Sequence, residues 1–318
     1  MKCNNCIGSG NVAIIGTGFV GSTAAFAMML DGVVNKISLI DIKKEKAEGE
    51  ALDLCHGMQF TRSIKIVSGD SFELVADAEV IVICAGFAQK SGEKRTDLLE
   101  KNVKIFKEII PKIVKYNKEA ILLVISNPVD ILTYVTWKLS GFDKCKIFSS
   151  GTVLDSARLR FLLGQYFQVS PKDISAYVLG EHGESEFVWW SKASIGSVSL
   201  DKFNGYSKKA LNEIYLKVKN AAAEIISKKG MTNYSIGLVV SKIVRAILLD
   251  QSRVFTVSTI LQNYNHLNNV ALSIPTIVRR GGVCKQIEID LDEKEKNLLD
   301  QSSEKIKSLI DQAENFLG

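Results

Sequence analysis

The sequence predicts an α/β protein in two parts, a doubly wound parallel sheet over residues 1–150 and an α+β domain over residues 151–318. In the first half, short and continuously apolar runs alternate with helical patterns, which is typical of parallel strands covered on both faces. After Gly151 the pattern changes to short strands and long helices. The length of 318 residues also exceeds the usual size of one hydrophobic core.

The first half is expected to consist of strands linked by helices. The expected strands are the apolar runs 11–15, 36–40, 64–67, 79–84, 120–125 and 146–149. The expected helices are 19–30, 43–56, 96–116 and 129–139. This alternation indicates β–α–β units, so the strands should run parallel.

The second half is expected to begin with a helix at 153–167. Short strands near 175–179 and 187–190 follow, and then helices at 207–228 and 233–249 and a strand-rich stretch at 254–290. Within that stretch, Gly281 and Gly282 predict the turn of a hairpin. Apolar residues at helical spacing predict a closing helix over 293–316.

The composition is that of an ordinary globular protein. Hydrophobic residues make up 46% and charged residues 24% of the chain, which argues against disorder as the main state. The net charge is only +5 and lysines alternate with glutamates, so a nucleic-acid partner is not expected. The longest apolar runs are far shorter than the ~20 residues of a membrane span. No charged and then apolar leader precedes the first strand, so we expect a cytoplasmic protein.

The six cysteines are scattered, and only Cys3 and Cys6 lie close together. A disulfide framework is usually denser and belongs to smaller secreted chains. The "CNNC" pair has the spacing of a metal or redox motif, but no second pair or nearby histidine completes a ligand set. We therefore expect no metal site, and interpret this segment as an N-terminal arm.

A glycine motif follows the first strand at the head of the first helix. The string "GTGFVG" has the G-x-G-x-x-G pattern, and Asp41 lies twenty residues past Gly21, at the end of the second strand. Such glycines let a pyrophosphate approach the positive end of a helix, and the acidic residue binds ribose hydroxyls. A purely structural turn is the alternative. The pattern favours a Rossmann-type site whose predicted cofactor-binding residues are Gly16, Gly18, Phe19, Val20, Gly21 and Asp41.

Asp41 also favours NAD over NADP. A carboxylate accepts hydrogen bonds from the ribose hydroxyls but repels the additional phosphate of NADP. The neighbouring Lys43 and Lys44 soften that repulsion, so this is a preference for NAD.

Of the three histidines, His182 is the candidate for chemistry. It stands in "LGEHGE", beside glycines that expose backbone to a ligand, whereas His56 and His266 have no such context. Upstream, "GTVLDSARLR" places Asp155 and Arg158 on one helix face. A carboxylate next to His182 would favour its protonated form, and the guanidinium suits a substrate carboxylate.

Seven strings together resemble the lactate/malate dehydrogenase family, and within it the L-lactate dehydrogenase branch. They cover nearly the whole chain in the family's order: "NVAIIGTGFVGST", "LIDIKKEKAEGEALDL", "AQKSGEKRTDL", "ISNPVDILTYV", "GTVLDSARLR", "LGEHGESEF" and "TNYSIG". The resemblance implies reversible hydride transfer between NADH and pyruvate, with lactate as the product.

The resemblance also implies a role for each matching residue. His182 would be the proton donor and acceptor, with Asp155 as its partner. Arg158 would bind the substrate carboxylate, and Arg95 would polarise the ketone. Three further residues would line the pocket: Asn127 near the reacting carbon and the nicotinamide, Ile236 against the nicotinamide, and Thr232 at the pocket boundary.

The loop "AQKSGEKR" is either a solvated connection or, by resemblance, the mobile lid that brings Arg95 to the substrate. Its place at the carboxyl end of a parallel strand favours the lid. At Gln89 the family's malate dehydrogenases carry an arginine, which pairs the second carboxylate of oxaloacetate. A neutral glutamine favours pyruvate, although Lys90 leaves room for some oxaloacetate turnover. 2-Oxobutyrate is also expected to react.

Two features concern regulation and assembly. Many bacterial family members bind fructose 1,6-bisphosphate through an arginine and a histidine, which correspond here to Arg160 and Ser175. Because serine supplies no cation, we predict weak or altered activation. The tandem pair Trp189 and Trp190 is expected to serve packing. By resemblance we expect a homotetramer.

Two other readings remain open. One is a malate or other L-2-hydroxyacid dehydrogenase, which Gln89 disfavours. The other is a non-catalytic NAD-responsive binding protein. Such a protein would need the glycines and Asp41 but not the histidine, carboxylate and arginines together.

Overall fold

The computed structural model describes residues 10–87 and 95–317, and its centre is one eight-stranded sheet. The strand order is β14-β13-β6-β5-β4-β1-β2-β3. Six of these strands pair in parallel: β1 (Asn11–Ile15), β2 (Lys36–Ile40), β3 (Lys65–Gly69), β4 (Val80–Ile83), β5 (Ile121–Val124) and β6 (Ile147–Ser149). The predicted doubly wound parallel sheet is confirmed.

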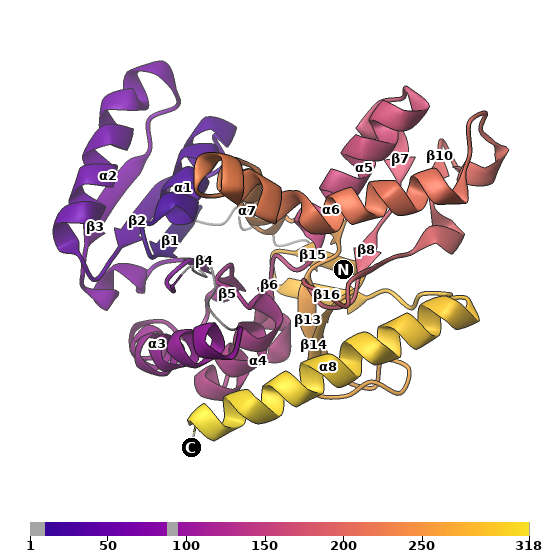
Figure 1. Ribbon diagram of the computed structural model, residues 1–318. Coiled ribbons are helices and arrows are strands. Elements are labelled where there is room, and N and C mark those ends of the chain that lie inside the picture. The colour runs from indigo at the N-terminus through magenta and orange to yellow at the C-terminus, as the bar shows by residue number, and fades with distance from the viewer. Residues whose placement is uncertain (1–9, 88–94, 318) are drawn as a thin grey trace, which may run out of the picture.

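Helices cover both faces of this sheet (Figure 1). One core packs α3 (Arg95–Tyr116), α4 (Val129–Ser140) and α8 (Glu293–Leu317) against the sheet. The other core contains α1 (Phe19–Asp31), α2 (Lys44–Gly57) and α7 (Tyr234–Leu248). The inner strands β4, β5 and β6 are therefore buried on both sides, which is why they are apolar without alternation, whereas the edge strand β3 is partly exposed.

The sheet is completed by two antiparallel strands from the second half of the chain. These are β13 (Ser258–Leu261) and β14 (Val270–Ser273), and β13 pairs with β6. The sequence predicted strands here but not this pairing. The two halves of the chain thus share one sheet.

The remainder of the second half surrounds a third core formed by α5 (Val153–Phe167) and α6 (Lys208–Lys229). The expected strand near 175–179 is in fact two strands of different sheets. β7 (Ile174–Ser175) pairs with β10 (Ser194–Ile195), which also pairs with β11 (Val198–Ser199). β8 (Val178–Leu179) pairs instead with β9 (Phe187–Val188). The change of partner lets the chain leave the third core and approach β14.

The predicted hairpin is confirmed, but its turn is formed by Arg280 and Gly281, and Gly282, which was expected in the turn, begins the second strand. β15 (Thr276–Arg279) pairs with β12 (Arg253–Phe255) and with β16 (Gly282–Gln286). At Gly282, φ is +92°, and a Cβ atom there would lie 2.2 Å from the carbonyl oxygen of Cys145. Both observations require glycine at this position.

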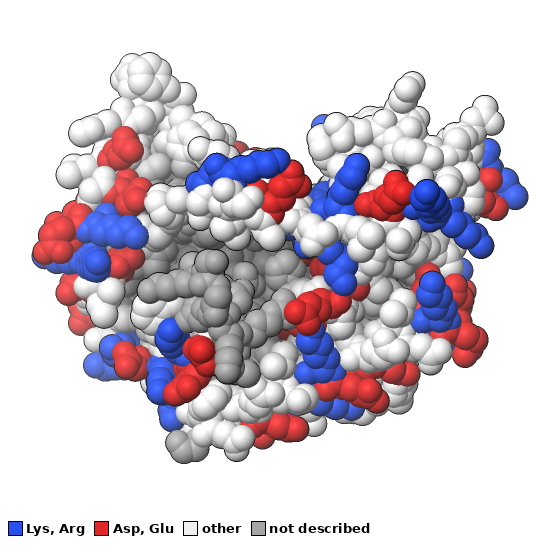
Figure 2. All heavy atoms as spheres, viewed as in Figure 1, with Lys and Arg blue, Asp and Glu red and all other residues white. Residues whose placement is uncertain are grey.

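The surface carries the mixture of positive and negative charges that the sequence predicts. On the face shown in Figure 2, the described Lys and Arg side chains are interspersed with Asp and Glu. Across the described ranges, no helix combines the length and apolarity needed to cross a membrane. Trp189 packs against the core of α3, α4 and α8, and Trp190 against the third core, which confirms their predicted packing role.

Candidate active site

The turn between β1 and α1 separates the three glycines by function. A Cβ atom on Gly16 would lie 2.6 Å from the backbone nitrogen of Ala85, and one on Gly21 would lie 2.0 Å from the carbonyl oxygen of Gly16. A Cβ atom on Gly18 would have only Lys46 Nζ near it, at 3.9 Å. Gly16 and Gly21 therefore permit close packing, whereas Gly18 leaves the N-terminus of α1 open to a ligand. This geometry fits a dinucleotide pyrophosphate. Phe19 and Val20 begin the helix there.

Asp41 is held as a carboxylate at the end of β2. Its Oδ2 accepts hydrogen bonds from the backbone N–H of Thr17, at 2.8 Å, and from the Thr17 hydroxyl, at 3.0 Å. Its Oδ1 accepts one from the N–H of Lys43. Burial raises the pKa of Asp41, but these hydrogen bonds outweigh burial and hold the pKa below its usual value. An ionised acceptor at the carboxyl end of β2 fits the ribose hydroxyls of a dinucleotide.

The start of α7 lies against α1. Gly237 packs so closely on Thr23 that an added Cβ would come within 2.7 Å of its methyl group. Asn233 donates a hydrogen bond to the Thr23 hydroxyl at 2.8 Å. This contact places Thr232 and Ile236, both half-buried, beside the helix that carries the glycine turn. Their position is compatible with the predicted nicotinamide and substrate contacts.

Asn127 follows β5 and is positioned by a residue that the sequence reasoning missed. The buried Asn102, on α3, donates to the carbonyl oxygen of Asn127 at 2.7 Å. The same side chain accepts from the N–H of Phe87 at 2.8 Å and donates to its carbonyl oxygen at 3.2 Å. Asn102 thus joins the ends of β4 and β5 at the carboxyl edge of the sheet, while the Asn127 side chain stays exposed.

The predicted residues His182, Asp155 and Arg158 lie together. His182 Nδ1 lies 2.7 Å from Asp155 Oδ2, and Arg158 Nη1 donates to Asp155 Oδ1 at 2.9 Å. The Asp155 side chain is only 4% exposed, and it lies in the first turn of α5, where the helix dipole favours negative charge. One buried carboxylate therefore orients both an imidazole and a guanidinium.

These contacts determine the protonation of His182. Burial lowers its pKa, but the charge of Asp155 and the hydrogen bond to it outweigh burial and raise the pKa to about 9. The pKa of Asp155 lies below its usual value, because His182 and Arg158 outweigh the effect of burial. The pair is therefore an ionised carboxylate and an imidazolium at neutral pH, with Nε2 of His182 left to reach a substrate.

The loop that carries His182 is fixed from two sides. Asp130 of α4 accepts a hydrogen bond from the His182 backbone N–H at 2.8 Å. Gly180 exchanges two backbone hydrogen bonds of 2.9 Å with Ser273 of β14, and the Glu181 N–H donates to Ser302 Oγ of α8. Burial raises the pKa of Asp130 to about 6. The sequence reasoning missed Asp130, although it stands in the "SNPVD" string.

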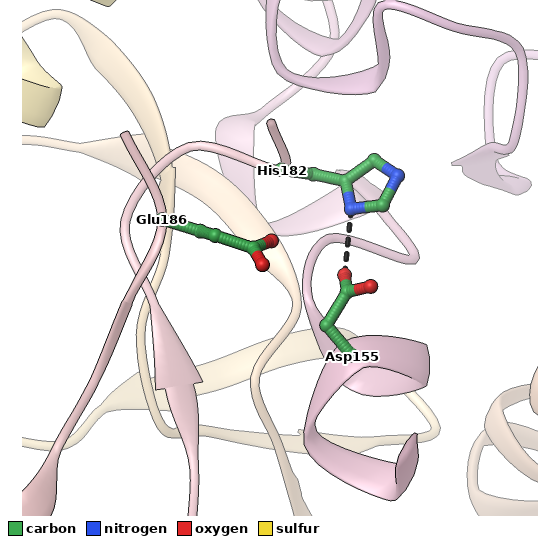
Figure 3. A group of neighbouring side chains, drawn as sticks. All are labelled: Asp155, His182 and Glu186. Atoms are coloured by element: carbon green, nitrogen blue, oxygen red, sulfur yellow. Dashed lines mark hydrogen bonds and ion pairs between the residues drawn. The ribbon is translucent and has the colours of Figure 1, made fainter. Parts of the chain in front are cut away.

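A third carboxyl group, that of Glu186, lies near this pair and was also missed (Figure 3). One oxygen or nitrogen atom from each of Asp155, His182 and Glu186 lies within 4.8 Å of the others. In the sequence, the only indication of this buried carboxyl group was that Glu186 directly precedes the apolar run "FVWW", where burial is expected.

Several other predicted residues are either outside the described part of the chain or make contacts outside this cluster. Gln89 lies outside the described residues, as do Cys3 and Cys6. Arg95 is the first residue of α3, but its side chain is outside the described part. Arg160 donates to the carbonyl oxygen of Ala176 at 2.9 Å, and Ser175 is exposed on β7.

Two family models of known proteins match this chain over nearly its whole length. Residues 10–149 match a family model described as lactate/malate dehydrogenase, NAD binding domain. Residues 152–317 match the model described as lactate/malate dehydrogenase, alpha/beta C-terminal domain.

Similar full-length proteins come from two clostridia. The chain is 45% identical over 307 residues to an L-lactate dehydrogenase of Clostridium botulinum (strain Loch Maree / Type A3), covering 95% of this chain and 96% of the relative. It is 45% identical over 311 residues to an L-lactate dehydrogenase of Clostridium perfringens (strain SM101 / Type A), covering 95% and 97%.

Two solved structures share the fold over nearly their whole length. One is a lactate dehydrogenase enzyme from a Medee basin deep-sea metagenome library, with a TM-score of 0.93, 40% identity, and coverage of 96% of this chain and 99% of the other. The second is a minor L-lactate dehydrogenase from Enterococcus mundtii in a ligands-bound form, with a TM-score of 0.92, 38% identity, and coverage of 95% and 98%.

Proposed function

Because this chain belongs to the lactate/malate dehydrogenase family, we propose that it reduces pyruvate to (S)-lactate with NADH and catalyses the reverse reaction. The family assignment confirms the resemblance of the sequence motifs. Within the chain, the observation that carries the proposal is the cluster of His182, Asp155 and Arg158. A binding protein without chemistry has no need for an imidazolium held by a buried carboxylate.

The first half of the chain, residues 1–150, is the proposed cofactor domain, and residues 151–318 the catalytic domain. The N-terminus of α1 at Gly18 would hold the pyrophosphate, and Asp41 the ribose hydroxyls. When bound, NADH supplies the hydride. Ile236, in the first turn of α7, is proposed to pack against the nicotinamide, and Asn127 to bond near it.

His182 is proposed to transfer the proton to and from the substrate. Negative charge builds on the ketone oxygen of pyruvate as the hydride arrives, so a proton donor and a cation are needed there. His182 Nε2 donates the proton, while Nδ1–H donates to Asp155, which stabilises the imidazolium. In lactate oxidation the neutral imidazole accepts the proton instead. Arg95 is proposed as the cation at the ketone.

Arg158 is proposed to bind the carboxylate of the substrate. One of its N–H groups is used by Asp155, and the planar guanidinium has further donors for a bidentate pair with a carboxylate. Since Asp155 fixes Arg158 and His182 together, the substrate carboxylate and the ketone oxygen would be oriented by one carboxylate. Thr232 is proposed to form part of the pocket wall beside α7.

Gln89 is proposed to select pyruvate over oxaloacetate. A neutral side chain leaves the second carboxylate of oxaloacetate without a partner in a closed pocket, which is costly. Gln89→Arg is therefore expected to move the ratio of kcat/KM from pyruvate toward oxaloacetate by roughly 30-fold or more, equivalent to about 2 kcal/mol.

The matched control is Gln301→Arg, which adds the same charge on the exposed surface of α8. It should leave the ratio unchanged. An unchanged ratio in Gln89→Arg would overturn the assignment of selectivity, and a wild-type protein that does not oxidise NADH with pyruvate would overturn the proposed function itself.

A homotetramer in the cytoplasm is the proposed form of the enzyme. Phe26 and Leu30 of α1 and Leu238 of α7 are each about half exposed, and so are Phe161 of α5 and Leu216 of α6. These side chains lie on two separate helix pairs, and a tetramer built from twofold axes covers more than one surface of each subunit.

A further inference from the structure

The carboxyl group of Glu186 is buried beside the proposed catalytic pair, and one of its oxygens has no hydrogen-bond partner among the described residues. The residue is 6% exposed, and its Oε1 is fully buried and has no hydrogen-bond partner among the described residues. Such an atom costs free energy, and buried unpaired groups in folded proteins often mark a functional site. Packing alone does not explain a carboxyl group at this position.

The direction of the side chain brings it to the chemistry. Glu186 extends from the start of β9 toward His182 and Asp155 (Figure 3), and the nearest polar atoms of the three residues lie within 4.8 Å of one another. At such a separation in a buried site, a change of charge on one group alters the proton affinity of the other two.

Charged and titratable groups face this position from several elements. From α5 come Asp155 and Arg158, and from α6 come Lys219 and Tyr215, whose hydroxyl donates to the backbone carbonyl of Glu186. His182 belongs to the same loop as Glu186.

From α4, Asp130 accepts the hydrogen bond from the His182 backbone N–H. Asp130 acts on His182 in the same direction as Glu186, since both carboxylates favour the imidazolium.

Burial also changes the pKa of the Glu186 carboxyl group itself. Burial and then the charge of Asp155 raise the pKa of Glu186 to about 8. Glu186 is therefore neutral at pH 7, and its ionisation falls in the range in which His182 also titrates. Groups that interact this closely titrate as a pair.

We propose that Glu186 is a positioning residue that acts through the Asp155–His182 pair: when neutral it leaves Asp155 as the nearest negative charge to His182, and when ionised it adds a second. The proposal rests on the proposed function, because it concerns the proton that His182 exchanges with substrate. Its consequence is a wider pH range for pyruvate reduction. As the pH rises, ionisation of Glu186 helps His182 to retain the proton that reduction requires.

The test is the pH dependence of kcat/KM for pyruvate in Glu186→Gln. The amide keeps the shape and removes the ionisation, so the basic limb is expected to move to lower pH by roughly one unit or more, as a neighbouring charge at this distance requires. Activity at pH 6, where Glu186 is neutral in the wild type, should remain within about threefold, less than the cost of a lost catalytic acid. The acidic limb of lactate oxidation should move in the same direction.

Two variants separate this role from packing. Glu184→Gln changes an exposed carboxylate two residues away that pairs with Lys305, and should leave the limb in place. Glu186→Met removes the polar group altogether. It should fold, and should show the same shift as Glu186→Gln. A limb that stays in place in both Glu186 variants, or moves equally in Glu184→Gln, overturns the proposal.

A direct titration separates failure of this proposal from failure of the proposed function. The chain has three histidines, so the ring signals of labelled histidine can be followed by NMR, with His182 assigned by its loss in His182→Asn. The His182 signal should titrate at lower pH in Glu186→Gln than in the wild type. If the wild type does not reduce pyruvate, the proposed function fails while this titration still decides the role of Glu186. An unchanged His182 titration overturns that role.

Discussion

At the scale of single residues, Asp155 is the group on which the site depends. It is buried in the first turn of α5 and bonds both His182 and Arg158. A buried carboxylate with two cationic partners costs far less than an unpaired one. The same arrangement places the proposed proton donor and the proposed carboxylate-binding group on one support.

Asp155→Asn is expected to lower kcat/KM for pyruvate by roughly 100- to 10,000-fold. The amide no longer stabilises the imidazolium, so burial dominates and the pKa of His182 falls from its value of about 9. Pyruvate reduction needs the protonated form, which exists below that pKa, so the basic limb of the residual activity should move to lower pH. Rate measurements from pH 5 to 10 check this, with the exposed Asp173→Asn as the control. A residual activity with an unmoved basic limb would contradict the role given to Asp155.

The sequence predicts the residues of this cluster whose side-chain type and immediate neighbours indicate chemistry, and misses those whose role depends on contacts made only in the fold, even where they stand in a recognised string. Asp155 and Arg158 lie one helical turn apart, and His182 stands in a glycine-rich loop, so each has a signal within a few positions. Asp130 contacts His182 from a helix 52 positions earlier in the chain. Asn102 joins two strand ends through hydrogen bonds that only the folded sheet creates. Contacts of this kind leave no periodic trace.

At the scale of elements, the turn from β1 to α1 combines two requirements. Gly21 lets the helix approach the strand, because a Cβ there would overlap the carbonyl oxygen of Gly16. Gly18 keeps the helix N-terminus accessible and has an extended backbone that other residues adopt without strain. The three glycines of one motif are therefore not equivalent.

Alanine substitutions should separate these requirements. Gly21→Ala is expected to lower the free energy of unfolding by about 1–3 kcal/mol or more, because the added Cβ overlaps the Gly16 carbonyl oxygen and forces the backbone apart. Gly18→Ala should change it by less than about 1 kcal/mol. It should nevertheless weaken NADH binding roughly tenfold, about 1.4 kcal/mol, by keeping the pyrophosphate from the backbone. Urea unfolding and fluorescence titration with NADH measure the two effects. Equal losses of stability in both variants would refute the distinction.

The helices and strands follow from periodicity and agree with the structure to within one or two residues at most ends. What periodicity does not supply is the partner of each strand. The apolar stretch after residue 254 indicates strands, yet β13 joins β6 while β15 joins β12 and β16. Pairing depends on packing between segments that are distant in the chain, so it has no local signature.

At the scale of the whole molecule, the predicted regulation concerns the surface that carries Arg160 of α5 and Ser175 of β7. Arg160 stacks its guanidinium 4.9 Å from the centre of the Tyr177 ring and donates to a backbone carbonyl. Ser175 is exposed on the neighbouring strand β7 and offers no charge to a phosphate. Ser175 thus supplies no cation at the position where the resemblance of the sequence implies a histidine.

Fructose 1,6-bisphosphate is therefore expected to activate the wild type less than about fivefold, which is the lower end of typical allosteric coupling. Ser175→His supplies a cation at that position and should increase the activation. Ser227→His, on the exposed surface of α6, is the matched control and should not. Initial rates at subsaturating pyruvate across an activator titration check both. Strong activation of the wild type would contradict the prediction.

The shared sheet has a consequence for how the chain is made. Ser149 of β6 pairs with Ser258 of β13, more than a hundred positions later. On the ribosome, the edge of β6 emerges early and stays unpaired until that later strand is translated, which takes about 5–20 seconds at ordinary elongation rates. An open strand edge is a template for aggregation. During the interval between these two strands the nascent chain therefore exposes an unpaired edge that chaperones can protect.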